Sequence, residues 1–220
     1  MQKNNKIKKW IGQILLWSVV LFSSQSGMAY SAPKTVLVLG DSLSAEYGLA
    51  RGTGWVALLV QRLQDKNLDV DLVNASISGE TTSGGAARIG DLLKKHHPGI
   101  VIVELGGNDG LRGLPLDAAL QNFRTIITVC KNAHASVLLV GMQIPPNYGR
   151  SYTDRFTAMY PTLAKEMHIP LVPFLLEGVA DKPDLFQADH IHVIAAAHPR
   201  LLDNVWPSLY ALLKPLLSGK

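Results

Sequence analysis

Short apolar runs alternate along the chain with longer stretches in which apolar residues recur every three or four positions. The short runs are rich in Val, Ile and Leu, which is typical of strands buried on both faces of a parallel sheet. The longer stretches have the periodicity of amphipathic helices. The pattern predicts strands over residues 35–39, 70–73, 100–105, 136–140 and 169–172, and helices over residues 55–63, 81–93, 116–133, 152–167 and 195–217.

This alternation predicts an α/β fold, a three-layer α/β/α sandwich around a central parallel sheet. Thr81 or Thr82 is available to cap the helix that follows the second strand. Pro199 and Pro207 are expected to delay the start of the closing helix or to bend it. Because no repeat, low-complexity tract or linker interrupts the pattern, we expect one domain over residues 30–220.

Residues 1–29 have a different pattern. Four lysines precede an apolar run at residues 10–22, and small, mostly polar residues follow it. This order is typical of a secretory signal peptide, and the small residues Gly27 and Ala29 favour cleavage after Ala29. The alternative is a membrane anchor, but the apolar run is shorter than the roughly 20 residues that span a bilayer.

The export segment also changes the charge of the chain. The chain has 21 basic and 17 acidic residues, and four of the lysines lie in residues 1–29, where there is no acid. Residues 30–220 therefore carry 17 of each and no net charge, so a nucleic-acid partner is not indicated. We expect a monomeric periplasmic or secreted bacterial protein with no stable membrane anchor after processing. Cys130 is the single cysteine and lies in an apolar helical pattern, so we expect a buried structural thiol.

Polar or glycine-rich sequence follows three of the predicted strands, at residues 40–42, 74–79 and 106–109. Ligands of α/β proteins bind at the carboxyl ends of the strands. The sequence therefore predicts a functional site at this edge of the sheet.

A serine and a nearby acid–histidine pair are the candidate catalytic groups. Ser42 follows the first strand and a glycine, where its hydroxyl could act as a nucleophile or simply as a turn or cap residue. Asp189 stands three residues before His192, so its carboxylate can orient that imidazole as a general base. His190 is the competing base, but a residue adjacent to Asp189 points away from it. The alternative is a solvated loop with two surface histidines, and no further ligand cluster supports a metal site.

An acyl-transfer site also needs donors for the oxyanion. The backbone N–H groups of Ser42 and Gly79 and the side-chain amide of Asn108 are the candidates. The alternatives are a simple turn for Gly79 and a capping or turn role for Asn108. Glu104, at the end of a buried strand, is expected to make a structural hydrogen bond, and Asp41 and Asp109 are expected to tie their loops together.

Together these residues resemble the four sequence blocks of the GDSL/SGNH hydrolase family. The blocks are Gly40-Asp41-Ser42-Leu43, the stretch ending at Gly79, Gly106-Gly107-Asn108-Asp109, and Asp189-x-x-His192. The longer matches at residues 41–48, 74–82, 104–113 and 146–149 are similar to the bacterial subgroup of thioesterase I, lysophospholipase and arylesterase enzymes.

The resemblance implies a flavodoxin-like sheet, no cofactor and a serine hydrolase. It makes Ser42 the nucleophile, His192 the base and Asp189 its orienter, with Ser42, Gly79 and Asn108 as the oxyanion hole. The sequence departs from the family at Val193, where proline is frequent, and at His190, where glycine is common. We interpret the later His198-Pro199 pair as a decoy, because no aspartate stands three residues before His198.

The expected reaction is hydrolysis of acyl esters and thioesters, such as aryl esters, acyl-CoA and lysophospholipids. We expect an apolar substrate groove, with residues 111–116 as a mobile flap; ordinary loop packing is the alternative. The groove residues are expected to be Leu111, Leu114, Pro115, Ile144 and Pro145. Competing hypotheses are a carbohydrate acetylesterase on the same fold and a non-catalytic binding module. A nucleotide-binding module is not favoured, because neither a G-x-G-x-x-G turn nor a P-loop lysine is present.

Overall fold

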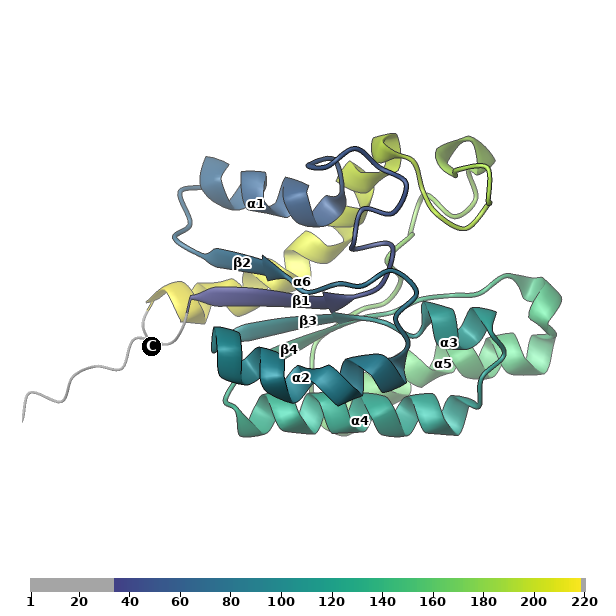
Figure 1. The fold of residues 1–220 in the computed structure, drawn as a ribbon, viewed down its shortest axis with the longest axis horizontal. Helices are drawn as coiled ribbons and strands as arrows, with labels where there is room; N and C mark the ends of the chain where they lie inside the picture. Colours follow the sequence, from purple (N-terminus) through teal and green to yellow (C-terminus); the bar gives the residue numbers. More distant parts are fainter. Residues whose placement is uncertain (1–33, 219–220) are drawn as a thin grey trace, which may run out of the picture. The chain divides into compact units, whose positions relative to one another are not determined.

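Five parallel strands form the central sheet in the computed structural model, which describes residues 34–218 (Figure 1). The strands are β1 (Thr35–Gly40), β2 (Asp71–Asn74), β3 (Ile100–Glu104), β4 (Ser136–Val140) and β5 (Leu171–Val172). Their order in the sheet is β2-β1-β3-β4-β5. This is the doubly wound order of flavodoxin-like folds, so the predicted fold is confirmed. The predicted signal peptide lies outside the described residues.

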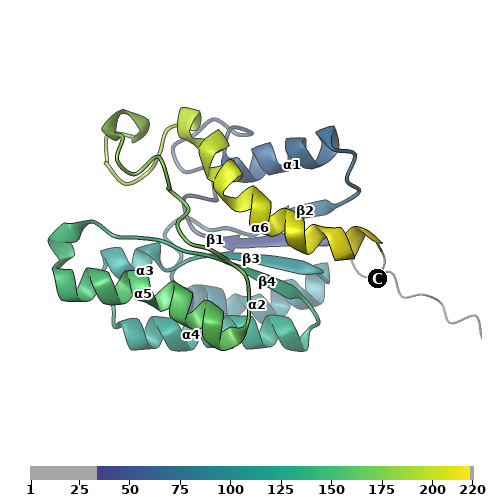
Figure 2. The same ribbon diagram turned by 180° about the vertical axis from the view of Figure 1, so that it is seen from behind.

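Helices cover both faces of the sheet. Figures 1 and 2 show α1 and α6 on one face and α2, α4 and α5 on the other. The helices are α1 (Trp55–Asp65), α2 (Thr82–His96), α3 (Gly107–Leu111), α4 (Leu116–Asn132), α5 (Arg150–Met167) and α6 (His198–Ser218). Short 3-10 turns lie at η1 (Pro146–Tyr148), η2 (Pro183–Leu185) and η3 (Ala195–Ala197). Because both faces are covered, all residues of β3 are buried, which explains the near-continuous apolar runs.

The differences from the predicted elements have local causes. Strand β5 is shorter than expected at its start, where Pro170 has no N–H to donate to the ladder, although its carbonyl accepts the N–H of Leu139. The closing helix begins at His198 rather than at residue 195, so the expected delay is confirmed. Pro199 is tolerated there because the first helical turn has no use for its N–H. The short helix α3 was not anticipated from its glycine-rich sequence.

Aromatic side chains fill the layer between the sheet and α4 and α5. Phe123, Phe156 and Tyr160 are fully buried, and both phenylalanine rings contact the Tyr160 ring edge to face. The Tyr160 hydroxyl donates to the carbonyl of Leu105, 2.9 Å away, just past the end of β3. This satisfied polar contact anchors the start of the loop that carries Asn108.

Two of the remaining histidines and the cysteine have structural positions. His97 and His168 adopt left-handed backbone conformations directly after α2 and α5, with φ of 43° and 50°. The thiol of Cys130 is buried in α4, and burial raises its pKa to about 12. A thiol with so high a pKa is a poor nucleophile, so the prediction of a buried structural cysteine is confirmed.

The long apolar helix at the end of the chain packs inward. Leu201, Val205, Leu209 and Leu213 of α6 are buried in the core. Among residues 34–218, no helix is both long enough and apolar enough to cross a membrane.

Candidate active site

The three polar strand ends meet at one edge of the sheet. Strands β2, β1 and β3 are neighbours and run parallel, so the loops after them leave the sheet side by side. These loops carry Gly79, Ser42 and Asn108. The base loop, which we define as residues 185–194, reaches the same edge from the other end of the sequence, and His192 contacts Ser42.

Ser42, His192 and Asp189 form a connected relay. The Ser42 Oγ lies 2.8 Å from Nε2 of His192, and Nδ1 of the same ring lies 2.6 Å from Oδ2 of Asp189. A carboxylate on Nδ1 fixes the proton there and leaves Nε2 as the acceptor that faces the hydroxyl. The three residues expected from the sequence are thus brought together in the arrangement that a serine nucleophile needs.

Asp189 is held in its ionised form. Desolvation raises its pKa, but the hydrogen bonds from the backbone N–H and imidazole of His192 and the N–H of Ile191 outweigh it, and the pKa falls to about 2. Across the neutral range the carboxylate is therefore charged. In that form it orients the imidazole and stabilises its protonated state.

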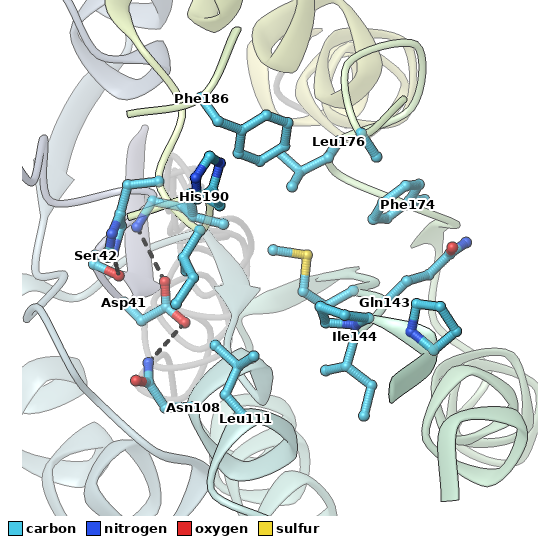
Figure 3. Close-up of a pocket in the computed structure, with 18 residues that line it drawn as sticks. Asp41, Ser42, Asn108, Leu111, Gln143, Ile144, Phe174, Leu176, Phe186 and His190 are labelled. Atoms are coloured by element: carbon cyan, nitrogen blue, oxygen red, sulfur yellow. Dashed lines mark hydrogen bonds between the residues drawn. The ribbon is translucent and has the colours of Figure 1, made fainter. Parts of the chain in front are cut away.

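The base loop closes as a narrow hairpin. The N–H of Gln187 donates to the carbonyl of His192 at 2.7 Å, and the N–H of Ile194 donates to the carbonyl of Leu185 at 2.9 Å. His190 occupies the turn with a left-handed φ of 57°. A conformation that glycine adopts at little cost is here taken by a histidine, and its ring points toward Phe186 rather than toward Ser42 (Figure 3).

The other departures have structural outcomes as well. Val193 is buried and pairs with Phe186 in an isolated antiparallel bridge. His198 is buried, and its Nδ1 accepts the first N–H of α1, from Trp55, at 3.0 Å. Burial lowers the pKa of His198, which suits the neutral ring that this acceptor role requires. His198 thus caps α1, and none of its hydrogen bonds is with Ser42.

The oxyanion-hole candidates lie on three segments that are tied together, namely the loop after β1, the loop after β2 and helix α3. The Asn108 side-chain amide donates to Oδ2 of Asp41 at 3.1 Å (Figure 3). Gly79 has a positive φ of 82°, and its carbonyl accepts from the Arg112 guanidinium at 2.9 Å. Asp109 accepts the hydroxyl and the N–H of Thr82, at 2.6 and 2.9 Å, so the expected tie between these loops is confirmed.

A pocket of about 450 Å³ opens beside Ser42. Its wall contains Ser42, Asn108, His192 and ten largely apolar side chains in two groups. One group comes from α3 and the loop after β4, and the other comes from the segment after β5 (Figure 3). Leu43, next to the nucleophile, also lines the pocket, and the two groups consist of Leu111, Met142, Ile144, Pro145, Pro146, Phe174, Leu176, Ala180, Phe186 and Ile191.

Three of the five expected groove residues line this pocket, namely Leu111, Ile144 and Pro145. Leu114 and Pro115 do not. They lie in the turn before α4, where the Leu114 carbonyl accepts the Tyr152 hydroxyl at 2.9 Å and Pro115 is the residue before the first helical turn. Gly79 is also outside the pocket lining.

Comparison with known proteins identifies the family. Residues 38–200 match the model of the GDSL-like Lipase/Acylhydrolase family. The chain belongs to this family. The esterase TesA of Pseudomonas aeruginosa is 48% identical over 200 residues, which cover 91% of this chain and 95% of TesA.

Other relatives have related names. The thioesterase 1/protease 1/lysophospholipase L1 of Escherichia coli is 43% identical over 203 residues, covering 92% of this chain and 93% of that protein. Among solved structures, the crystal structure of TesA has a TM-score of 0.78 at 50% identity and covers 83% of this chain and 99% of that one. A psychrotrophic esterase, EstA from Pseudoalteromonas sp. inhibited by monoethylphosphonate, has a TM-score of 0.78 at 38% identity and covers 82% and 98%.

A buried acid cluster supports the nucleophile loop of this GDSL hydrolase, which we define as residues 41–54, between β1 and α1. Glu104 accepts the Ser44 hydroxyl at 2.6 Å, and the Trp55 indole donates to the same Ser44 oxygen at 3.2 Å. Burial, and next the charge of Asp41, raise the pKa of Glu104 well above its ordinary value. Burial thus favours the neutral form of Glu104, and its contact with Ser44 is structural, as expected.

Asp41 lies between this cluster and the site. Its Oδ1 accepts the N–H of Leu43 at 3.1 Å, while its Oδ2 accepts the Asn108 amide. Burial raises the pKa of Asp41 to about 6, against hydrogen bonds from Leu43 and Asn108 and the charge of His192 that lower it. Asp41 therefore joins the nucleophile loop to α3, which confirms its expected role.

The second wall of the pocket was missed from the sequence. Phe174, Leu176 and Phe186 lie between β5 and Asp189, a segment with 3-10 turns and no regular pattern. The strand-end rule that pointed to the other loops also applies to β5, and would have indicated Phe174 two residues after it. Within residues 34–218, no group of three or more His, Cys, Asp or Glu side chains is positioned to hold a metal ion.

Proposed function

We propose that this GDSL hydrolase is a serine esterase that cleaves carboxylic esters and thioesters through an acyl-enzyme intermediate on Ser42. The observation that carries the proposal is the continuous relay from Ser42 Oγ through the His192 imidazole to the Asp189 carboxylate, with contacts of 2.8 and 2.6 Å. Family membership and the esterases among the relatives support the same reaction class.

In the first step, the Ser42 hydroxyl attacks the substrate carbonyl while Nε2 of His192 accepts its proton. The ionised Asp189 stabilises the imidazolium that forms. The carbonyl oxygen gains negative charge, which the N–H groups of Ser42 and Gly79 and the Asn108 amide are proposed to stabilise. For Asn108 this requires the amide to serve the oxyanion from a position that Asp41 already orients.

The acyl-enzyme forms when His192 protonates the leaving alcohol or thiol and the C–O or C–S bond breaks. Water then attacks the acyl-enzyme with His192 again accepting a proton. His192 returns this proton to Ser42 Oγ as the bond between the acyl carbon and Oγ breaks and the acid leaves. In this scheme the catalytic side chains and the backbone N–H donors all belong to the chain itself.

The substrates are proposed to be aryl esters, acyl-CoA thioesters and lysophospholipids. The relatives named esterase, thioesterase and lysophospholipase, and an arylesterase of Vibrio mimicus that is 41% identical over 192 residues, support this range. The apolar pocket of about 450 Å³ beside Ser42 is within the size range of small-molecule sites and suits a fatty acyl chain.

Tyr148 and Tyr152 donate to the carbonyls of Leu111 and Leu114, so motion of residues 111–116 would have to break these two bonds.

We also propose that the protein acts in the periplasm or outside the cell as a monomer without a stable membrane anchor. The proposal rests on the signal-peptide pattern of residues 1–29, with four lysines before a short apolar run. N-terminal sequencing of the exported protein would check it, with Tyr30 expected as the first residue.

Ser42→Ala and His192→Ala test the reaction. Both variants are expected to lose at least about 10⁴-fold in kcat on p-nitrophenyl esters, because members of such a relay act as a unit. Either variant retaining near-normal turnover would disprove the mechanism.

A panel of acyl-CoA, lysophospholipid, aryl ester and acetylated xylan tests the substrate class. Preference for acetyl groups on sugar over long acyl chains would favour a carbohydrate acetylesterase instead.

A further inference from the structure

The nucleophile loop and the base loop are held together by one side chain that does not line the substrate pocket. Gln187 Nε2 donates to the Tyr47 carbonyl on the nucleophile loop and to the Val193 carbonyl on the base loop, each at 3.0 Å. Its backbone N–H donates to the His192 carbonyl at 2.7 Å. One residue thus contacts the backbone on both sides of the Ser42–His192 hydrogen bond.

The nucleophile loop is shaped to admit this side chain. Gly48 has a positive φ of 70°, and a Cβ placed on it would overlap the side-chain oxygen of Gln187. Only a glycine meets both demands at this position. The fit between Gly48 and Gln187 is a second observation that the two loops are built around the amide.

The residue whose carbonyl accepts from Gln187 also covers the catalytic imidazole. The Tyr47 ring lies over the His192 ring, with centroids 4.3 Å apart and planes inclined by 36°. Tyr47 is half exposed, so packing against the core does not hold its ring in place. The Tyr47 N–H donates to the Ser42 carbonyl at 3.3 Å, and the Gln187 amide donates to the Tyr47 carbonyl. These two bonds fix the backbone that carries the ring.

We propose that Gln187 is a positioning residue for the reaction, because it brackets the two loops and thereby holds His192 against both Ser42 and the Tyr47 ring. Gln187 acts through His192 and Tyr47 and does not touch the reacting atoms. The inference rests on the proposed function. It means that the hydrogen bonds of the Gln187 amide, and not the relay alone, set the distance between Ser42 and His192.

The test compares Gln187→Ala and Gln187→Glu with Gln61→Ala, which changes an exposed glutamine of α1. Gln187→Glu keeps the shape but replaces the donating NH₂ with an acceptor that faces two carbonyls. We expect both Gln187 variants to lower kcat by about 10- to 100-fold, since small misplacements of catalytic groups cost up to this much. The KM is expected to stay within about twofold because Gln187 is absent from the pocket wall.

Three readouts separate positioning from general stability. Urea unfolding confirms that each variant is folded under assay conditions. A purely structural role of Gln187 would leave the kcat of folded Gln187→Glu unchanged, and that result would overturn the proposal. When Gln187→Glu is combined with Tyr47→Leu, the losses in kcat are expected to be non-additive, because both changes act on His192. Fully additive losses would contradict a shared action of Gln187 and Tyr47 on His192.

Ser42→Ala, assayed alongside, keeps the two proposals distinguishable. If Ser42→Ala retains activity, the proposed function fails. If Ser42→Ala is inactive while both Gln187 variants have normal kcat, only the positioning role fails. The expected pattern is an inactive Ser42→Ala, impaired Gln187 variants with near-normal KM, and a fully active Gln61→Ala.

Discussion

The carboxyl group of Asp189 lies in the base loop with 37% of its side chain exposed, whereas that of Glu104 lies at the end of β3 with 1% exposed. Hydrogen bonds from His192 and Ile191 hold the pKa of Asp189 at about 2 in spite of desolvation. Burial, with no basic partner among its hydrogen-bond contacts in the described chain, raises the pKa of Glu104. The pKa values of two acids near one nucleophile loop are thus shifted in opposite directions.

The two environments determine which acid can serve the reaction. A charged carboxylate on Nδ1 stabilises an imidazolium, while a protonated one cannot. Glu104 instead accepts from Ser44, two residues after the nucleophile, and so supports the turn from which Ser42 is presented. The surroundings of Asp189 favour its charged form, which can act on His192. The surroundings of Glu104 favour its neutral form, because a charge would be costly to bury there.

The largest effect is expected from Asp189→Asn. Asparagine keeps the shape but removes the charge and permits the wrong tautomer of His192, so kcat should fall by about 10⁴-fold with little change in KM. Steady-state kinetics on a p-nitrophenyl ester measure it. A loss of less than about tenfold would show that the charge of Asp189 is not needed and would remove the contrast with Glu104.

A matched pair at Glu104 tests the opposite claim. Glu104→Gln resembles the protonated acid, so we expect a loss of about 1 kcal/mol or less in the free energy of unfolding and near-normal kcat. Glu104→Ala leaves a cavity and deprives the Ser44 hydroxyl of its acceptor, for a loss of about 2–5 kcal/mol. Urea unfolding at neutral pH gives both values. Equal losses for the two variants, or a collapse of kcat in Glu104→Gln, would mean that an ionised Glu104 is required.

The smallest effect is a change in pH dependence at Asp41. Its folded pKa of about 6 lies above its ordinary value of 3.8, so the neutral form is favoured by folding. The stabilisation from this group is complete below pH 3.8 and is lost as the pH rises through about 6. The free energy of unfolding of Asp41→Asn should therefore fall less steeply than that of the unmodified protein over this window. Parallel slopes for the two proteins in urea titrations would contradict the raised pKa.

The sequence predicted the sheet, its parallel direction and most helices, because buried apolar runs and helical periodicity are local properties. It also indicated that Ser42, His192 and Asp189 would come together, as they do in the structure, since polar residues at strand ends and a three-residue spacing are visible without coordinates. Leu114 and Pro115 were misplaced because proximity along the chain does not reveal that the turn before α4 faces Tyr152. Phe174 and Phe186 were missed because the segment after β5 has no periodicity.

The bracket at Gln187 could not be predicted for a different reason. Its contact with the Tyr47 carbonyl depends on how the loop after β1 meets a loop some 140 residues later in the chain, and neither loop has a regular backbone. Local patterns reveal which groups are present at a site, while the distances between them follow from the packing of distant segments.

Labelling with a fluorophosphonate probe is the sharpest test of Ser42 as a nucleophile activated by His192, because such probes form a covalent bond with an activated serine. Peptide mass spectrometry of the labelled protein should find one adduct per chain, on Ser42, and the adduct should be lost in His192→Ala. An adduct on another serine, or labelling of Ser42 that persists at full rate in His192→Ala, would contradict the proposed relay.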